Sequence, residues 1–193
     1  AFDRLSNHHK DWQFVMVDKN LDRLEGLKGP NIRSENMDGV RFLIDHLRPE
    51  TGVSWIVPSL PLHIAWEWCR TKIGPNKIVR AAVSLKINSF LPNPVHGKNK
   101  DIYVSNADFR CPDNCSEPEK FCTITRRPRQ KDMFCRLEEL QFEDFLPIVL
   151  QSRQIEPGVG GYSPEQLFSF LKKVEGSKGR LLLSTACKCH GVI

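Results

Sequence analysis

Short apolar runs and amphipathic stripes follow one another along the first half of the chain. The run at residues 12–18 (WQFVMVD) is almost wholly apolar and stops at an acid, which predicts a buried strand. Residues 37–47 carry apolar side chains at i, i+3, i+4 and i+7, so they are predicted to form a helix. Residues 54–57 predict a second strand, which Pro58 ends. Strand, helix and strand in this order are typical of a parallel α/β unit.

The second half shows regular patterns on both sides of an irregular stretch. Ser163, Pro164 and Gln166 have the spacing of a capping box and predict the start of a helix that runs to residue 174. The other predicted elements are a helix over residues 62–73, strands over 78–85 and 102–104, a helix over 131–140, and strands over 145–152 and 180–185. Between them, residues 92–130 are predicted to be an irregular, cysteine-containing insertion.

Composition places the chain among ordinary globular proteins. It has 193 residues, of which 40% are hydrophobic and 26% charged, enough for one sizeable core. We therefore predict a single α/β domain over residues 1–193. The apolar runs are far shorter than the roughly 18 residues that cross a bilayer, so no membrane partner is expected. The odd count of seven cysteines and their clustering favour ligands or redox groups over disulfides, and hence a cytoplasmic location.

Asp18 stands where the predicted first strand ends. The helix, strand and acid of residues 1–18 resemble the second half of a Rossmann unit and look like the NAD-binding domains of potassium-uptake regulators. This resemblance covers residues 1 to about 85. It implies a Rossmann-like, mostly parallel sheet flanked by helices, with Asp18 binding the ribose of NAD(P). The glycine-rich loop that holds the pyrophosphate would lie upstream of residue 1, so NAD(P) is expected only if the natural protein includes such a loop.

Cysteines and a histidine gather in two segments far apart in the sequence. Zinc and iron–sulfur sites need about four soft ligands, which two short clusters can supply together. The spacing C-x3-C-x6-C fits neither a zinc knuckle nor a ferredoxin, so zinc, an iron–sulfur cluster and redox thiols all stay open. The predicted ligands are Cys111, Cys115, Cys122, Cys187, Cys189 and His190. We expect the loop that carries the first three to lie against the other three. Cys135 and Cys69 are predicted to be structural.

The segments CPDNCSEPEKFCTITRRPR and CKCHGV are similar to those of an uncharacterised bacterial protein family, which implies one design but no activity. Two hypotheses follow. The first is a Rossmann-like protein with a cysteine-centred metal or redox site, serving NAD(P)-linked redox chemistry or sensing. The second is a non-catalytic binding or regulatory module with a structural metal. No spacing typical of a hydrolase is present, so whether the chain is an enzyme stays open.

Partners follow from charge. The net charge is +5, and its densest source is residues 120–131, which include Arg126, Arg127 and Arg129. A nucleotide or another small anionic ligand is therefore a candidate partner, with the glycine-rich PGVGGY turn before the capped helix as a second place for an anion. A charge this modest argues against nucleic acid. The oligomeric state cannot be read from the sequence.

Overall fold

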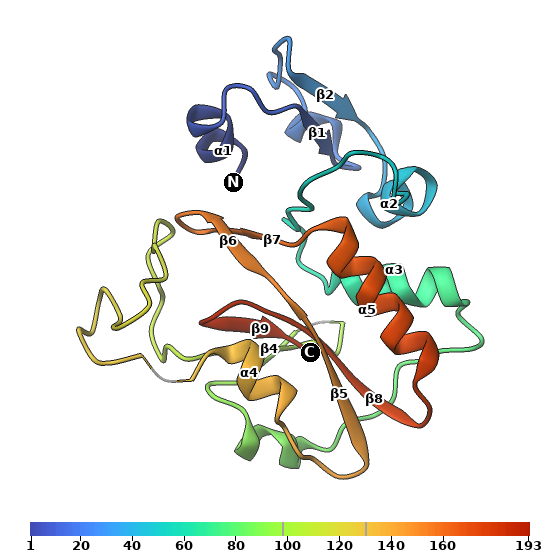
Figure 1. The fold of residues 1–193 in the computed structure, drawn as a ribbon, viewed down its shortest axis with the longest axis vertical. Coiled ribbons are helices and arrows are strands. Elements are labelled where there is room, and N and C mark those ends of the chain that lie inside the picture. Colours follow the sequence, from blue (N-terminus) through green and yellow to red (C-terminus); the bar gives the residue numbers. More distant parts are fainter. Residues whose placement is uncertain (98, 130) are drawn as a thin grey trace. The chain divides into compact units, whose positions relative to one another are not determined.

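The computed structural model describes residues 1–97, 99–129 and 131–193 (Figure 1). The chain forms two compact units, residues 1–52 and 53–193, and each is described here by itself. The expectation of one domain over residues 1–193 stays a prediction. Within the described residues, no helix is both long enough and apolar enough to cross a membrane.

The first unit is built around two parallel strands. β1 (Phe14–Val17) pairs in register with β2 (Ile32–Glu35), and the connection between them contains a short 3-10 helix (Leu21–Arg23). The helix α1 (Phe2–His8) precedes β1, and α2 (Gly39–His46) follows β2. The predicted strand at 12–18 is thus confirmed. β2 was not predicted, because its sequence IRSE is largely polar and partly exposed.

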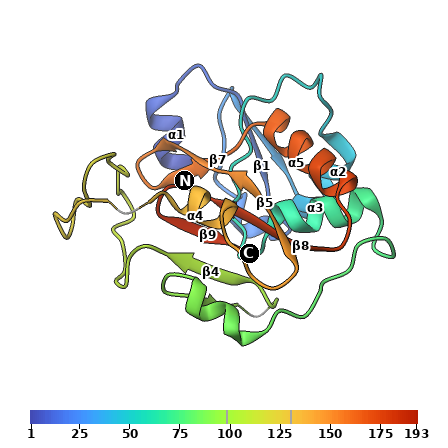
Figure 2. The same cartoon turned by 60° about the horizontal axis from the view of Figure 1, so that its bottom comes forward.

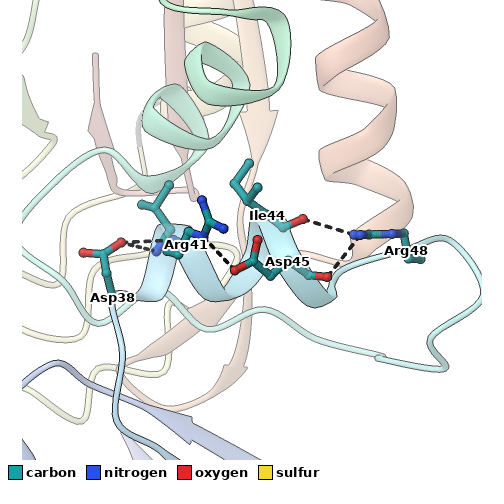
Figure 3. Close-up of polar contacts among 6 residues, drawn as sticks. Asp38, Arg41, Ile44, Asp45 and Arg48 are labelled. Atoms are coloured by element: carbon teal, nitrogen blue, oxygen red, sulfur yellow. Dashed lines mark hydrogen bonds and ion pairs between the residues drawn. The ribbon is translucent and has the colours of Figure 1, made fainter.

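Helix α2 confirms the helix predicted at residues 37–47, and polar contacts fix both of its ends (Figure 3). Asp38 is the N-cap, and its side chain accepts hydrogen bonds of 3.0 Å from the backbone N–H groups of the next turn. Arg41 pairs with Asp45 one turn later at 2.6 Å. At the C-terminal end, the Arg48 guanidinium donates to the carbonyl of Ile44 at 3.1 Å.

The second unit contains a five-stranded mixed sheet of order β3-β4-β9-β8-β5. Only β5 and β8 pair in parallel, and the other three pairings are antiparallel. A separate hairpin, β6–β7, follows β5. The bounds of the elements are α3 (Ile64–Ile73), the 3-10 helix η2 (Leu85–Phe90), β3 (Val95–His96), β4 (Ile102–Ser105), α4 (Met133–Glu138), β5 (Phe145–Gln151), β6 (Arg153–Glu156), β7 (Val159–Gly161), α5 (Pro164–Gly176), β8 (Arg180–Ala186) and β9 (His190–Val192).

The predicted Rossmann-like, mostly parallel sheet is therefore wrong. In the second unit, β5, α5 and β8 do form one parallel β-α-β unit. Its helix, α5, begins at the capping box of Ser163, as predicted. Residues 54–57 form no strand and contribute only the isolated bridge between Ile56 and Tyr162, so they do not share a sheet with β1 or β8. The strand predicted at 78–85 is absent as well. Short strands such as β9 complete the antiparallel part of the sheet. The pattern of apolar residues cannot reveal such a strand, because three residues are too few to show a periodicity.

Helices cover both faces of the five-stranded sheet. Because side chains alternate along β8, Leu182 and Ala186 face the core formed with α4 and η2, whereas Thr185 faces α3. Helices α3 and α5 lie side by side in both views, and α4 lies beside β9 (Figure 2). The helix predicted at 62–73 is confirmed by α3, whose Cys69 is fully buried as expected. The sheet is thus a rigid support between two helical layers.

The predicted irregular insertion is only partly irregular. Residues 95–105 contain β3 and β4, and β4 lies inside the sheet instead of at its edge. From residue 106 to 129 there is no helix or paired strand, apart from the isolated bridge between Phe121 and Pro128. These residues, 106–129, are called the cysteine loop below. The loop is the yellow-green segment at the left of Figure 1.

His63 is buried at the start of α3, with 3% of its surface exposed, and its Nε2 lies 2.9 Å from the hydroxyl of Thr185. Burial lowers the pKa of His63 from 6.5 to about 4; the nearby Asp101 carboxylate opposes this shift and the Arg80 guanidinium adds to it. The imidazole is therefore neutral in the folded protein at neutral pH.

The unfolded chain binds a proton at His63 before the folded protein does, so stability should fall as the pH drops from about 6.5 to about 4. The loss attributable to this group is roughly 3 kcal/mol. Urea unfolding as a function of pH measures it. H63Q should flatten the curve in this window, whereas H96Q, which changes an exposed histidine of β3, should leave the slope as it is. An unchanged slope in H63Q would contradict the assignment.

Candidate metal centre

The turn between β8 and β9 presents two thiols and an imidazole. It consists of Cys187, Lys188, Cys189 and His190, and the N–H of Cys187 donates to the carbonyl of His190 at 2.9 Å. The backbone N–H groups of Cys189 and His190 both donate to the Sγ of Cys187, at 3.4 Å and 3.3 Å respectively. Two N–H donors aimed at one sulfur stabilise its thiolate form, which is the form that binds metal.

Close packing holds this turn against the sheet. A Cβ added at Gly191 would lie 3.1 Å from both Ala186 Cβ and Leu137 Cδ1, so β9 can approach β8 and α4 this closely because residue 191 has no side chain. The first N–H groups of α4 also reach the turn: Met133 donates to the carbonyl of Lys188 at 2.9 Å, and Phe134 to that of Cys187 at 3.3 Å. The helix start thus finds partners for N–H groups that have none within the helix.

Asn106, the first residue of the cysteine loop, completes the support. Its backbone N–H donates to the carbonyl of Cys189 at 2.9 Å, and its side-chain amide donates to that of Lys188 at 3.3 Å. The amide oxygen of Asn106 is buried and has no hydrogen-bond partner among the described residues. The turn is therefore held from β4, from α4 and from its own strands, so its thiols have a defined position.

The cysteine loop crosses in front of this turn and contacts it directly. Glu117 Oε1 lies 2.7 Å from the Sγ of Cys187, and Arg129 Nη2 donates to the Sγ of Cys189 at 2.8 Å. Arg129 also donates to the carbonyl of Pro118 at 2.6 Å, which ties two parts of the loop together. The loop and the turn, about 70 residues apart in the sequence, thus meet in space as expected.

A second anchor fixes the loop at Cys115. Its carbonyl accepts hydrogen bonds from the Gln154 side chain at 2.7 Å and from the Gly158 N–H at 3.0 Å. Gly158 has φ of +74° in the tight turn between β6 and β7, a conformation that favours glycine. The glycine-rich PGVGGY segment is therefore a hairpin turn that holds the cysteine loop, and Gly158 uses its N–H for that contact.

Three groups are close enough to share one ion. The ligand atoms of Glu117, Cys187 and His190 all lie within 4.8 Å of one another, and the Cys187 Sγ is 3.9 Å from the Nδ1 of His190. Glu117 reaches this position with φ of +44°, in the left-handed region that non-glycine residues seldom adopt. Such backbone strain persists where surrounding contacts hold it, commonly at functional sites.

The thiols influence one another across the two segments. Burial raises the pKa of Cys187 to about 12, and the charge of Glu117 adds to this; burial also raises the pKa of Cys189 to about 11, against the effect of Arg129. The charges of Cys111 and Cys115 add to the upward shift of the pKa of Cys189. Hydrogen bonds from Thr125 lower the pKa of Cys122. Without a metal, most of the buried thiols therefore hold their protons at neutral pH.

Of the predicted ligands, Cys187 and His190 share a group with Glu117, and the binding of a metal stays a prediction. Cys135 lies on α4, is partly exposed and is not part of that group. Asp18 lies in the first unit, where it accepts a hydrogen bond from the Asn20 N–H at 2.8 Å and pairs with Arg23 at 3.4 Å. These contacts are those of a residue that stabilises the next turn. The reason to assign Asp18 a ribose was the Rossmann resemblance, which the sheet order removes.

Sequence reasoning missed Glu117 and Asn106. Glu117 could have been noticed, because it is a carboxylate between Cys115 and Cys122 in a segment already expected to bind metal. Asn106 gave no signal, since its role depends on the antiparallel pairing of β4 with β9. That pairing brings the end of β4 next to the turn.

Two comparisons with known proteins find similar sequences. Residues 65–193 match a family model described as "Uncharacterized protein, C-terminal domain". An "Uncharacterized protein" of the archaeon Archaeoglobus fulgidus is 33% identical over 199 residues, which cover 93% of this chain and 86% of that protein. No solved structure matches.

The resemblance to a Rossmann NAD(P)-binding domain within a bacterial family is therefore wrong: the matches name no nucleotide-binding family, and the relative is archaeal. The chain belongs to the family of that C-terminal domain, and the matched segment contains the whole candidate metal centre.

Proposed function

We propose that the chain binds one zinc ion between the cysteine loop and the β8–β9 turn, and that this ion holds the loop in place. The observation that carries the proposal is the convergence of Glu117, Cys187 and His190, whose ligand atoms lie within 4.8 Å of one another. Thiolate, imidazole and carboxylate are the three protein ligand types that zinc takes. The function is then that of a zinc-stapled binding or regulatory module.

The mixed ligand set favours zinc over an iron–sulfur cluster. Clusters are held almost entirely by cysteine thiolates, and a carboxylate is a hard ligand that a soft cluster iron seldom takes. In this site a carboxylate oxygen is the nearest neighbour of the Cys187 sulfur, at 2.7 Å. Zinc accepts sulfur, nitrogen and oxygen together in tetrahedral geometry.

Charge supports Cys189 as the fourth ligand. Zinc with Glu117, the Cys187 thiolate and neutral His190 has no net charge, and a second thiolate makes the site −1 in total. The Arg129 guanidinium, 2.8 Å from the Cys189 sulfur, offsets that charge. Cys111, Cys115 and Cys122 remain predicted ligands, and the C115S variant tests one of them.

A structural role follows from the loop that the site closes. Residues 106–129 have no helix or paired strand, and such a long irregular segment needs a staple. Besides Asn106 at its start, the loop contacts the rest of the unit through Glu117, Arg129 and Cys115, and the contacts of Glu117 and Arg129 involve the candidate ligands Cys187 and Cys189. Four protein ligands close a structural site, whereas a catalytic site keeps an open position for water.

A redox dithiol is the second candidate, and one observation favours it. The Cys189 sulfur accepts a hydrogen bond from Arg129 of the cysteine loop, and Cys189 and Cys111 are both partly exposed thiols. A disulfide between the loop and the turn would staple the loop as zinc does. Metal analysis combined with a count of free thiols separates the two.

Protein purified without chelator and without air should contain about one zinc ion per chain, with little iron, because four closed ligands bind zinc tightly. Elemental analysis measures the content. C187S and C189S should each lower it at least tenfold after dialysis, since loss of one thiolate opens the site.

The matched control is C135S, which removes a thiol that lies on α4 outside the cluster and should leave the zinc content unchanged. C115S distinguishes the alternatives: retained zinc places Cys115 outside the ligand set, and loss places it inside. Equal zinc content in the wild-type protein, C187S and C189S would contradict the proposal. Iron with visible absorption would indicate a cluster instead.

Removing zinc should loosen the loop while the sheet persists. Amide hydrogen exchange should speed up by at least tenfold over residues 106–129 in the presence of a chelator, because the binding free energy then no longer holds the loop. Amides of β5 and β8 should exchange as slowly as before, since they pair with each other along seven residues. Hydrogen-exchange mass spectrometry measures both. Identical protection with and without chelator would show that the ion has no structural role.

A further inference from the structure

A pocket of about 340 Å³ lies at the other end of β8 from the metal centre. Its floor is apolar and includes Leu182, Leu183 and Ile102 from the sheet. The segment at residues 77–83, between α3 and η2, forms one wall. The volume lies in the range of small-molecule sites, which combine an apolar surface with a few placed polar groups.

Basic side chains line this pocket from separate parts of the chain. They are Lys77, Arg80, Lys100 and Arg180. Among the residues that the structure describes, no acidic side chain lines the pocket, although acids pair with the two arginines. The charges therefore converge on the cavity, in contrast to the dispersed charges of an ordinary surface.

The two arginines are held in fixed positions. Arg80 pairs with the buried Asp101 at 2.7 Å, and its guanidinium lies 5.3 Å from the ring centre of Trp66. Arg180 pairs with Asp144 at 2.6 Å and stacks on Phe145 at 3.9 Å. A guanidinium held this way keeps free N–H groups for a ligand and loses little rotamer entropy when the ligand binds.

The two lysines supply the charge that is not neutralised. Lys77 and Lys100 have no acidic partner among the described residues, whereas each arginine has at least one. The charge that faces the cavity without an acidic partner among the described residues is therefore that of the two lysines, beside an apolar lining. A ligand that matches it has an apolar body and an anionic group with one or two negative charges.

We propose that this pocket binds a small organic anion, with its phosphate or carboxylate group at Lys77 and Lys100 and its apolar body on Leu181 and Leu183. This site is independent of the zinc proposal, because the pocket lies at the start of β8 and the metal centre follows its end. Phosphate and carboxylate share the recognition chemistry, and comparison of the two probes distinguishes them. The second unit would then combine a stapled loop with a separate ligand site.

The test is an NMR titration of the full chain with zinc present. The probes are phenyl phosphate, benzoate, inorganic phosphate and benzyl alcohol. Phenyl phosphate or benzoate should shift the amide signals of residues 77–83 and 179–183. Both should bind at least tenfold more tightly than inorganic phosphate, which lacks the apolar body, and than benzyl alcohol, which lacks the anionic group.

The variant K77Q/K100Q should weaken binding of the organic anion about tenfold, roughly threefold for each exposed and screened charge. K172Q/K173Q is the control: it removes the same charge from an exposed stretch of α5 and should change the affinity less than twofold. Equal losses in the two variants would overturn the proposal, since they would indicate attraction to net charge alone. Benzyl alcohol that binds as tightly as phenyl phosphate, or shifts confined to other residues, would overturn it too.

Discussion

The contact between Glu117 and the Cys187 sulfur is the interaction on which the candidate centre depends. Burial raises the pKa of Cys187, and the charge of the adjacent Glu117 carboxylate raises it further, so this thiol resists ionisation. A cation between them reverses the sign of the interaction, because both groups then become ligands. The left-handed backbone of Glu117 and the two N–H groups aimed at Cys187 are consistent with that use.

The sheet positions this contact through its antiparallel edge. The β8–β9 turn lies where β4, α4 and the two strands all supply hydrogen bonds, and Gly191 permits the close approach. The cysteine loop leaves from the end of β4 and returns at the start of α4, so both of its ends are next to the turn. The same strand, β8, has the basic pocket at its beginning, which places two candidate sites on one rigid element.

Prediction from the sequence succeeded for the helices and strands that local interactions determine. The capping box of Ser163, the apolar stripe of α3 and the run that forms β5 specify their elements without help from the rest of the chain. It failed on the sheet, because β9 is three residues long and pairs with β4, which lies far from it in the sequence. Of the six predicted ligands, Cys187 and His190 lie in one group together with Glu117, which was not predicted, and the binding of a metal by any of them stays a prediction.

Zinc K-edge X-ray absorption of the purified protein tests the central claim most directly, because it counts the atoms bound to the ion. The proposed ligands predict two sulfur atoms at about 2.3 Å and two nitrogen or oxygen atoms at about 2.0–2.2 Å. C189S should lower the sulfur count to one in whatever zinc remains. Four sulfur ligands would contradict the account, because they would place the ion among the cysteines alone and exclude Glu117 and His190.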